Sequence, residues 1–106
     1  MDLIGRSEEL LLLAIWRLQD DAYGVRILES MNRSTGRDWS IGSIYAPLHR
    51  LQRKGLVKTT EGAVDPDRGG RPTVLYNLTP KGKQALLDVK AVHDAVWTGI
   101  MKLEPS

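Results

Sequence analysis

The chain has 106 residues, a formal net charge of +2 and no cysteine. This length predicts one domain with a core of its own, and the lack of cysteine excludes a disulfide framework and a thiolate metal site. We expect no signal peptide. The longest apolar run, residues 10–16, is far too short to cross a bilayer, so a cytoplasmic protein is the simplest interpretation.

The charges are unevenly distributed along the chain. Residues 40–83 hold eight basic and three acidic residues, a net of +5, whereas the remaining residues carry a net of −3. A basic middle between acidic flanks is typical of a module that binds an anion such as nucleic acid. The charges alone also fit a solvated surface with chance clustering.

The N-terminal third predicts two helices. The first spans about residues 7–19, with Ser7 as a candidate N-cap and apolar residues around nearly the whole circumference. A small domain has trouble burying every side of a terminal helix, so a second chain is one way to cover the spare face. The second helix spans about residues 23–34, with Gly36 as its C-terminal stop.

A third helix is predicted over about residues 42–54, followed by Gly55 as a C-terminal glycine. Pro47 indicates where this helix begins, because the first N–H groups of a helix lack intrahelical partners. At 100° steps, one side of the helix collects an apolar core stripe. That stripe is Ile41, Ile44, Leu48 and Leu51.

The opposite face of this third helix is the candidate DNA-reading surface. Its hydroxyl groups and cations offer contacts to phosphates and, for arginine, bidentate contacts to guanine. The candidate residues are Ser43, Tyr45, His49, Arg50, Arg53 and Lys54. Taken alone, this pattern also fits an ordinary amphipathic helix whose outer face meets water.

A β-hairpin with a long loop is predicted over about residues 57–78. The stretches LVKTTE and TVLYNL are predicted strands, and the linker between them is GAVDPDRGGRP. Arg68 and Arg71 flank a Gly-Gly tip that can lie against phosphates or enter a minor groove. A solubilising turn is the alternative for this loop, and its two aspartates favour that alternative mildly.

The last helix opens in LTPKGKQALL, with Thr79 as N-cap and Pro80 at the first helical position. We expect it to continue to about Leu103. Its apolar stripe runs past the point where a small domain needs core, which favours a partner helix. The predicted interface residues on it are Leu86, Val89, Val92, Val96, Ile100 and Leu103.

Three helices, a hairpin and a final helix give a mainly α fold with a small β-hairpin, the order of a winged helix-turn-helix. In that fold the helix before the hairpin is the recognition helix. We divide the chain into a winged helix-turn-helix DNA-binding domain over residues 1–79 and a long C-terminal dimerisation helix over residues 80–106. A dimer would place two recognition helices roughly 34 Å apart, which favours an inverted-repeat operator.

The stretches GSIYAPLHRLQRKGLV, GGRPTVLYNLTPKGKQAL and AYGVRI resemble the PadR family of winged helix-turn-helix transcriptional regulators over about residues 10–87. The resemblance implies a homodimeric repressor that binds a double-stranded DNA operator, and whose first and last helices form the dimer interface. Leu10 and Leu13 are then the interface residues of the first helix. By position, the resemblance points to the DNA contacts Ser43, Tyr45, Arg50, Arg68 and Arg71.

The chain departs from the family's pattern at Arg26, at Gln52 and in the order Ala46-Pro47, which bears on the operator sequence rather than on the fold. The chain resembles the family's short subgroup, some of whose members bind planar drugs or aromatic compounds between subunits. Trp16 and Trp97 are the candidates to line such a pocket for a small hydrophobic or aromatic effector. The pattern favours the alternative, in which both tryptophans simply pack the dimer interface.

We expect neither an enzyme nor a metal or cofactor site. Asp65 and Asp67 lie on the predicted wing tip, where nothing dehydrates a carboxylate pair. The two histidines, His49 and His93, lie far apart in the predicted fold, and DRGGRP is no phosphate loop because no helix follows it. A winged domain used only for protein–protein contacts is the remaining alternative to DNA binding.

Overall fold

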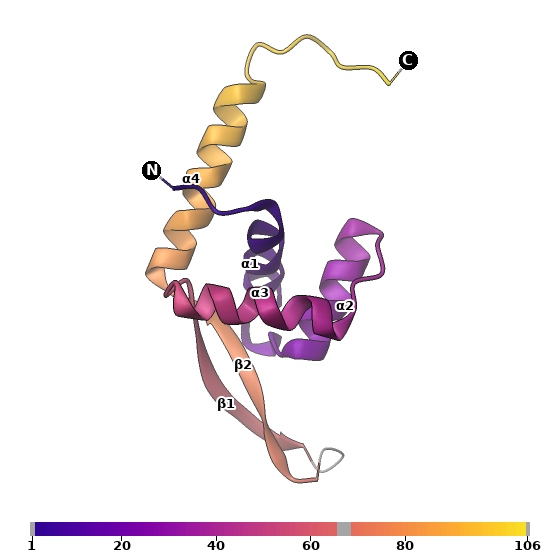
Figure 1. The fold of residues 1–106 in the computed structure, drawn as a ribbon, viewed down its shortest axis with the longest axis vertical. Coiled ribbons are helices and arrows are strands. Elements are labelled where there is room, and N and C mark those ends of the chain that lie inside the picture. The colour runs from indigo at the N-terminus through magenta and orange to yellow at the C-terminus, as the bar shows by residue number, and fades with distance from the viewer. Residues whose placement is uncertain (1, 66–68, 106) are drawn as a thin grey trace.

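The computed structural model describes residues 2–65 and 69–105. Figure 1 shows the helices of the N-terminal half in the middle, a hairpin extending to one side and the last helix projecting to the other. Over the described residues the elements are α1 (Arg6–Leu18), the 3-10 turn η1 (Gln19–Asp21), α2 (Gly24–Thr35), α3 (Ile41–Arg53), β1 (Val57–Asp65), β2 (Arg71–Leu78) and α4 (Pro80–Trp97). The predicted winged helix-turn-helix order is confirmed.

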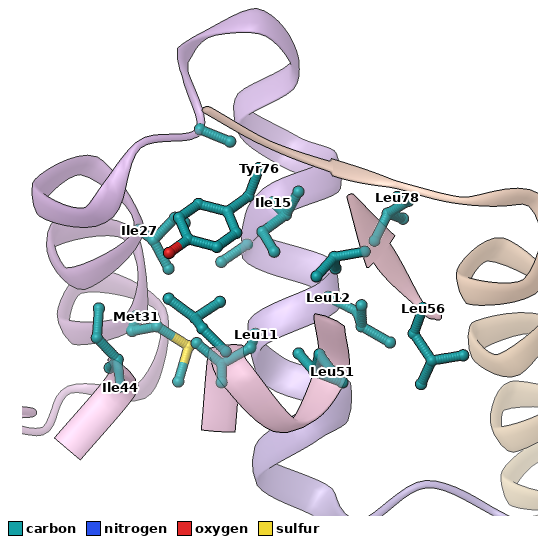
Figure 2. Packing of buried hydrophobic residues seen from close by; sticks show 14 residues of the cluster. Leu11, Leu12, Ile15, Ile27, Met31, Ile44, Leu51, Leu56, Tyr76 and Leu78 are labelled. Carbon is teal, nitrogen blue, oxygen red and sulfur yellow. The ribbon is translucent and has the colours of Figure 1, made fainter. Parts of the chain in front are cut away.

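The core lies between α1, α2, α3 and the base of the hairpin (Figure 2). Three of the four residues of the predicted α3 stripe, Ile44, Leu48 and Leu51, are completely buried. The fourth, Ile41, is 39% exposed because it lies in the first turn of the helix. Burying each such side chain contributes about 1.5–3 kcal/mol, so α3 is held to the body mainly by its apolar stripe.

The N-terminus of α1 differs from the prediction. The helix begins at Arg6 with Gly5 as its N-cap, so the assignment of this role to Ser7 is wrong. The Glu8 carboxylate accepts a hydrogen bond from the Gly5 backbone N–H at 3.1 Å. An acid in the first turn thus satisfies an N–H group that lacks an intrahelical partner, and no hydroxyl cap is needed.

The two ends of α3 follow from local sequence. The Oγ of Ser40 accepts from the backbone N–H of Ser43, and the Oγ of Ser43 accepts from the N–H of Ser40, both at 3.1 Å. At the other end, Gly55 takes a positive φ of 75°, as predicted. Pro47 is buried and lies beyond the first turn, so it does not mark the helix start; it leaves the Ser43 carbonyl without its regular helical donor.

The strands of the hairpin are longer than predicted. β1 and β2 pair antiparallel from Val57 opposite Leu78 to Asp65 opposite Arg71, so both ends of the predicted loop belong to the strands. The register shifts between Glu61 and Val64, which marks a β-bulge. A side chain at Gly62 would clash with the Thr73 hydroxyl. The glycine interpreted as a loop residue therefore belongs to a bulge inside a strand.

The base of the hairpin is fastened to the segment between α1 and α2. The backbone N–H of Tyr76 donates to the Ala22 carbonyl at 2.8 Å. Tyr23 and Leu75 form an isolated antiparallel bridge beside this bond. The side chain of Tyr76 is buried in the core, so the wing has a fixed position against the helices.

The last helix is shorter than predicted. Thr79 caps it by accepting a hydrogen bond from Gly82 N–H at 3.1 Å, and Pro80 is its first residue, as predicted. It ends at Trp97 and not near Leu103, because Thr98 is extended and Gly99 takes a φ of 79°. Ile100 and Leu103 therefore lie beyond the helix on which they were predicted. The pair Thr98-Gly99 is a stop signal that the apolar stripe obscured.

In the part of the chain that the structure describes, no helix combines the length and apolarity needed to traverse a bilayer. Over the same residues, no group of three or more histidine, cysteine or acidic side chains is arranged to hold a metal ion.

Candidate nucleic-acid interface

The outward face of α3 is basic and open. His49, Arg50 and Arg53 are exposed and line one shallow surface depression together with Ala46 and Gln52. The ion pairs formed between described residues involve neither Arg50 nor Arg53. Both guanidinium groups are therefore available to an anion that approaches this face.

Ser43 has a local structural task. Its hydroxyl donates to the Ser40 carbonyl at 2.7 Å while accepting from the Ser40 N–H. The side chain, although exposed, is thus engaged in capping α3. The spacing of Ser40 and Ser43 matches a capping box and was the sequence signal for this role.

Tyr45 reaches from α3 to the start of α2. A side-chain carbon added at Gly24 would lie 2.8 Å from the Tyr45 hydroxyl oxygen, so the Tyr45 ring would have to shift if Gly24 carried a side chain. Burial, and next the charge of the neighbouring Tyr45, raise the pKa of Tyr76. Tyr45 remains 40% exposed. It therefore packs α3 against α2 and still presents one edge outward.

The side chain of Lys54 forms an ion pair with another helix of the same chain. Its Nζ lies 2.7 Å from a carboxylate oxygen of Glu8 on α1. Glu8 is only 8% exposed, and a buried carboxylate requires a partner of opposite charge. A residue predicted as a DNA contact is thus the ion-pair partner of a buried acid, which the sequence did not indicate because 46 residues separate the two.

The environment of Glu8 favours its charged form. Burial by itself raises the pKa of Glu8, but hydrogen bonds from Lys54 and the Gly5 N–H, together with the positive charges of Lys54 and Arg50, outweigh burial. The net result is a pKa below the ordinary value of 4.5. Glu8 is therefore ionised at neutral pH.

The wing tip is described only in part. Arg68 lies outside the described residues, and of Arg71 only the backbone pairing with Asp65 is described. Gly69 and Gly70 both take positive φ values, 71° and 79°, which glycine adopts without strain. The tip therefore turns through the Gly-Gly pair singled out in the sequence.

A second exposed surface is apolar and lies on α1 and α4. Figure 1 shows α4 projecting beyond the helical body, and all residues from 91 to 105 are exposed. Leu13 remains 41% exposed, whereas Leu10, Leu86 and Val89 are partly buried. The exposed apolar side chains of α4 are Leu87, Val92, Val96 and Trp97.

An apolar groove of about 560 Å³ runs between α1 and α4. Trp16 lines it, and Lys83 Nζ lies 5.2 Å from the centre of the Trp16 ring, a cation–π contact. Trp97 is not among the lining residues; its ring centre lies 6.0 Å from that of His93. Within one chain, the structure does not bring the two candidate effector residues into one pocket.

A helix-turn-helix, a hairpin fastened to it and a basic exposed face on the helix before the hairpin define a winged helix protein. Residues 12–88 match the sequence model of the transcriptional regulator PadR-like family. The chain belongs to that family.

Individual relatives agree with this assignment. Transcriptional regulator Rv3488 of Mycobacterium tuberculosis is 32% identical over 69 residues, which are 65% of this chain and 60% of that protein. A crystal structure of a PadR family transcription regulator from Clostridium difficile R20291 has a TM-score of 0.65 at 27% identity, covering 87% of this chain and 90% of that one. RosR of H. salinarum, at a TM-score of 0.73 and 22% identity, covers 92% and 81% of the two chains and is similar in fold.

Proposed function

We propose that this protein is a transcriptional repressor that binds an inverted-repeat DNA operator as a homodimer, with α3 as its recognition helix. The observation that carries the proposal is the face of α3 on which Arg50 and Arg53 are exposed and, among the described residues, form no ion pair with an acid. Membership of the PadR-like transcriptional regulators supports it.

The recognition face has a chemical order that suits a groove. Gly42 and Ala46 are small and exposed near the start of α3, so the helix can approach a base edge closely. Arg50 and Arg53 follow, and arginine binds phosphates or guanine. We assign Tyr45 and His49 to the same face, and Arg68 and Arg71 to backbone contacts from the wing. Ser43 and Lys54 act through local contacts instead.

The dimer proposal rests on α4. Placed at 100° steps, Val89, Val92 and Val96 fall within about 60° of one another. They continue the side on which Gly82 is buried against the chain's own domain, past the point where that domain ends. A second copy of α4 is an occupant that matches an apolar helix face.

The groove beside Trp16 is the place for an effector in this proposal. Its volume lies within the range of small-molecule sites, about 300–1,000 Å³. The surface that it exposes is mainly apolar, which suits a hydrophobic or aromatic compound. The polar residues of its lining are Arg6, Glu9, Lys83, Lys90 and His93. The alternative is that the partner subunit fills the groove, and titration of the dimer with a planar aromatic dye while tryptophan fluorescence is recorded distinguishes the two.

Selection of bound DNA from a random double-stranded pool tests the function. We expect enrichment of an inverted repeat, and we expect affinity for it to fall steeply with salt, because each neutralised phosphate releases counterions. A protein–protein interaction module would enrich no sequence and would show no salt-dependent DNA binding. That outcome would reject DNA binding.

A further inference from the structure

Three consecutive residues at the C-terminal end of α3, Lys54, Gly55 and Leu56, receive hydrogen bonds from the start of α4. Lys81 Nζ donates to the Lys54 carbonyl at 3.0 Å. The Thr79 hydroxyl donates to the Gly55 carbonyl at 2.6 Å. The Thr79 backbone N–H donates to the Leu56 carbonyl at 3.1 Å. We call residues 54–56 the α3–α4 junction.

Two further contacts hold the junction. Gly82 is buried against it so closely that a side-chain carbon there would overlap the Leu56 carbonyl oxygen. The side chain of Lys54 reaches the other way, to the buried carboxylate of Glu8 at 2.7 Å. The junction therefore joins α3 to both α1 and α4, the two helices that carry the exposed apolar surface.

The opposite end of α3 is held by α2 instead. The Trp39 N–H donates to the Asn32 side chain at 2.6 Å, which fixes the segment between the two helices. Tyr45 packs against Gly24 at the start of α2. The helix-turn-helix is thus one unit, and the junction is where that unit meets the helices proposed to dimerise.

Directional contacts at this point have a large effect on geometry. Apolar packing is non-directional, whereas ion pairs and hydrogen bonds specify one arrangement of the groups they join. α3 has 13 residues and is therefore about 20 Å long. A rotation of about 10° at the junction displaces its far end by about 3 Å, close to one base-pair step.

We propose that Glu8 and Lys54 are positioning residues that set the distance between the two recognition helices of the dimer, and with it the half-site spacing that the protein selects. The inference rests on the proposed function, since it takes α4 as the dimer helix and α3 as the DNA-reading helix. Neither residue contacts DNA in this role; both act through the orientation of α3 relative to α1, which together with α4 carries the exposed apolar surface.

The direction in which one substitution changes DNA affinity distinguishes a positioning role from a direct electrostatic effect. Glu8→Gln removes a negative charge, so a purely electrostatic effect would strengthen DNA binding. Positioning predicts the opposite at the preferred spacing, because the Lys54 contact that orients α3 is weakened. Lys54→Arg retains the ion pair and should retain the spacing preference.

The experiment uses the full chain and a series of operators whose half-sites are moved apart or together one base pair at a time. For the unaltered protein we expect a sharp optimum. Glu8→Gln and Lys54→Met should each reduce the preference for the best spacing over its neighbours by about fivefold. The matched control is Glu29→Gln, the same chemical change in an exposed pair with Arg26 at 3.4 Å, and it should leave the preference unchanged.

Two other results would overturn the inference alone, and a third would overturn the proposed function as well. An unaltered sharp optimum in Glu8→Gln, equal to that of Glu29→Gln, overturns the inference and leaves the proposed function standing. If Lys54→Met lowers operator affinity equally at every spacing and reduces the salt dependence by about one counterion, Lys54 is a phosphate contact. That result also overturns the inference. An unaltered protein that binds no operator overturns the proposed function and this inference together. If circular dichroism shows that Glu8→Gln is unfolded, the spacing preferences of Lys54→Met and Lys54→Arg are compared instead, since Lys54 is half-exposed.

Discussion

Helices α3 and α4 both expose side chains that the rest of the chain does not cover, but the two exposed surfaces differ in chemistry. The outer face of α3 presents arginine, histidine and glutamine, whereas the large apolar side chains exposed on the second half of α4 are Val92, Val96 and Trp97. An exposed basic face is stable in water and attracts a polyanion. A contiguous apolar face is costly in water and is typical of a protein interface. The two surfaces therefore suit partners of different chemistry.

The largest expected effect concerns the apolar surface of α4. Val96→Glu places a charge at the C-terminal end of the stripe formed by Val89, Val92 and Val96, where the side chain is 66% exposed in the single chain. In a dimer that charge would be buried without a partner, so we expect association to weaken by more than about 100-fold. Sedimentation velocity should show monomers. The control Ala91→Glu adds the same charge at an exposed position about 140° around the helix from Val96, and a dimer that survives Val96→Glu places the interface elsewhere.

The next largest effect concerns the basic face of α3. Arg50→Ala combined with Arg53→Ala removes two cations from the α3 face without touching its buried stripe. We expect operator affinity to fall about 10- to 100-fold and the salt dependence to fall by about two counterions. Fluorescence anisotropy over a salt series measures both quantities. Arg33→Ala, an exposed arginine of α2, is the control, and equal losses in the two proteins would contradict the assignment of α3.

A smaller effect concerns the place where the two helices meet. Gly82→Ala forces α4 away from the Leu56 carbonyl, because the added methyl group has no space. We expect a loss of about 1–3 kcal/mol in the free energy of unfolding, the usual cost of overpacking. Urea denaturation followed by circular dichroism measures it. A free energy of unfolding equal to that of the unaltered protein would show that the α3–α4 junction accommodates the added methyl group without destabilising the fold.

The smallest effect is the pH dependence of the Glu8–Lys54 ion pair. Since the pKa of Glu8 in the folded chain lies below 4.5, its charged form stabilises the fold above that pH. This contribution is lost as the pH falls through the lower folded-state value. The difference in melting temperature between the unaltered protein and Glu8→Gln should therefore shrink between pH 7 and pH 3. A difference that stays constant over this range would mean that the carboxylate charge does not contribute.

The sequence by itself determined the features that depend on near neighbours. The order of the elements, the cap at Thr79, the stops at Gly36 and Gly55 and most of the α3 stripe follow from periodicity and from hydrogen bonds a few residues long. The errors at Ser7 and at the end of α4 were also local. Glu8 accepts the hydrogen bond of the Gly5 N–H at the start of α1, and Gly99 ends a helix that its apolar stripe suggested would continue.

Only the tertiary structure decided which of the candidate side chains are available to a partner. In the sequence, Lys54 is one cation among three at the end of α3, but folding brings it to Glu8 on α1. Tyr45 likewise meets Gly24, and Trp16 lies over a groove that Trp97 does not line. These contacts join residues distant in the chain, and their geometry is set by how the helices pack rather than by any short sequence pattern.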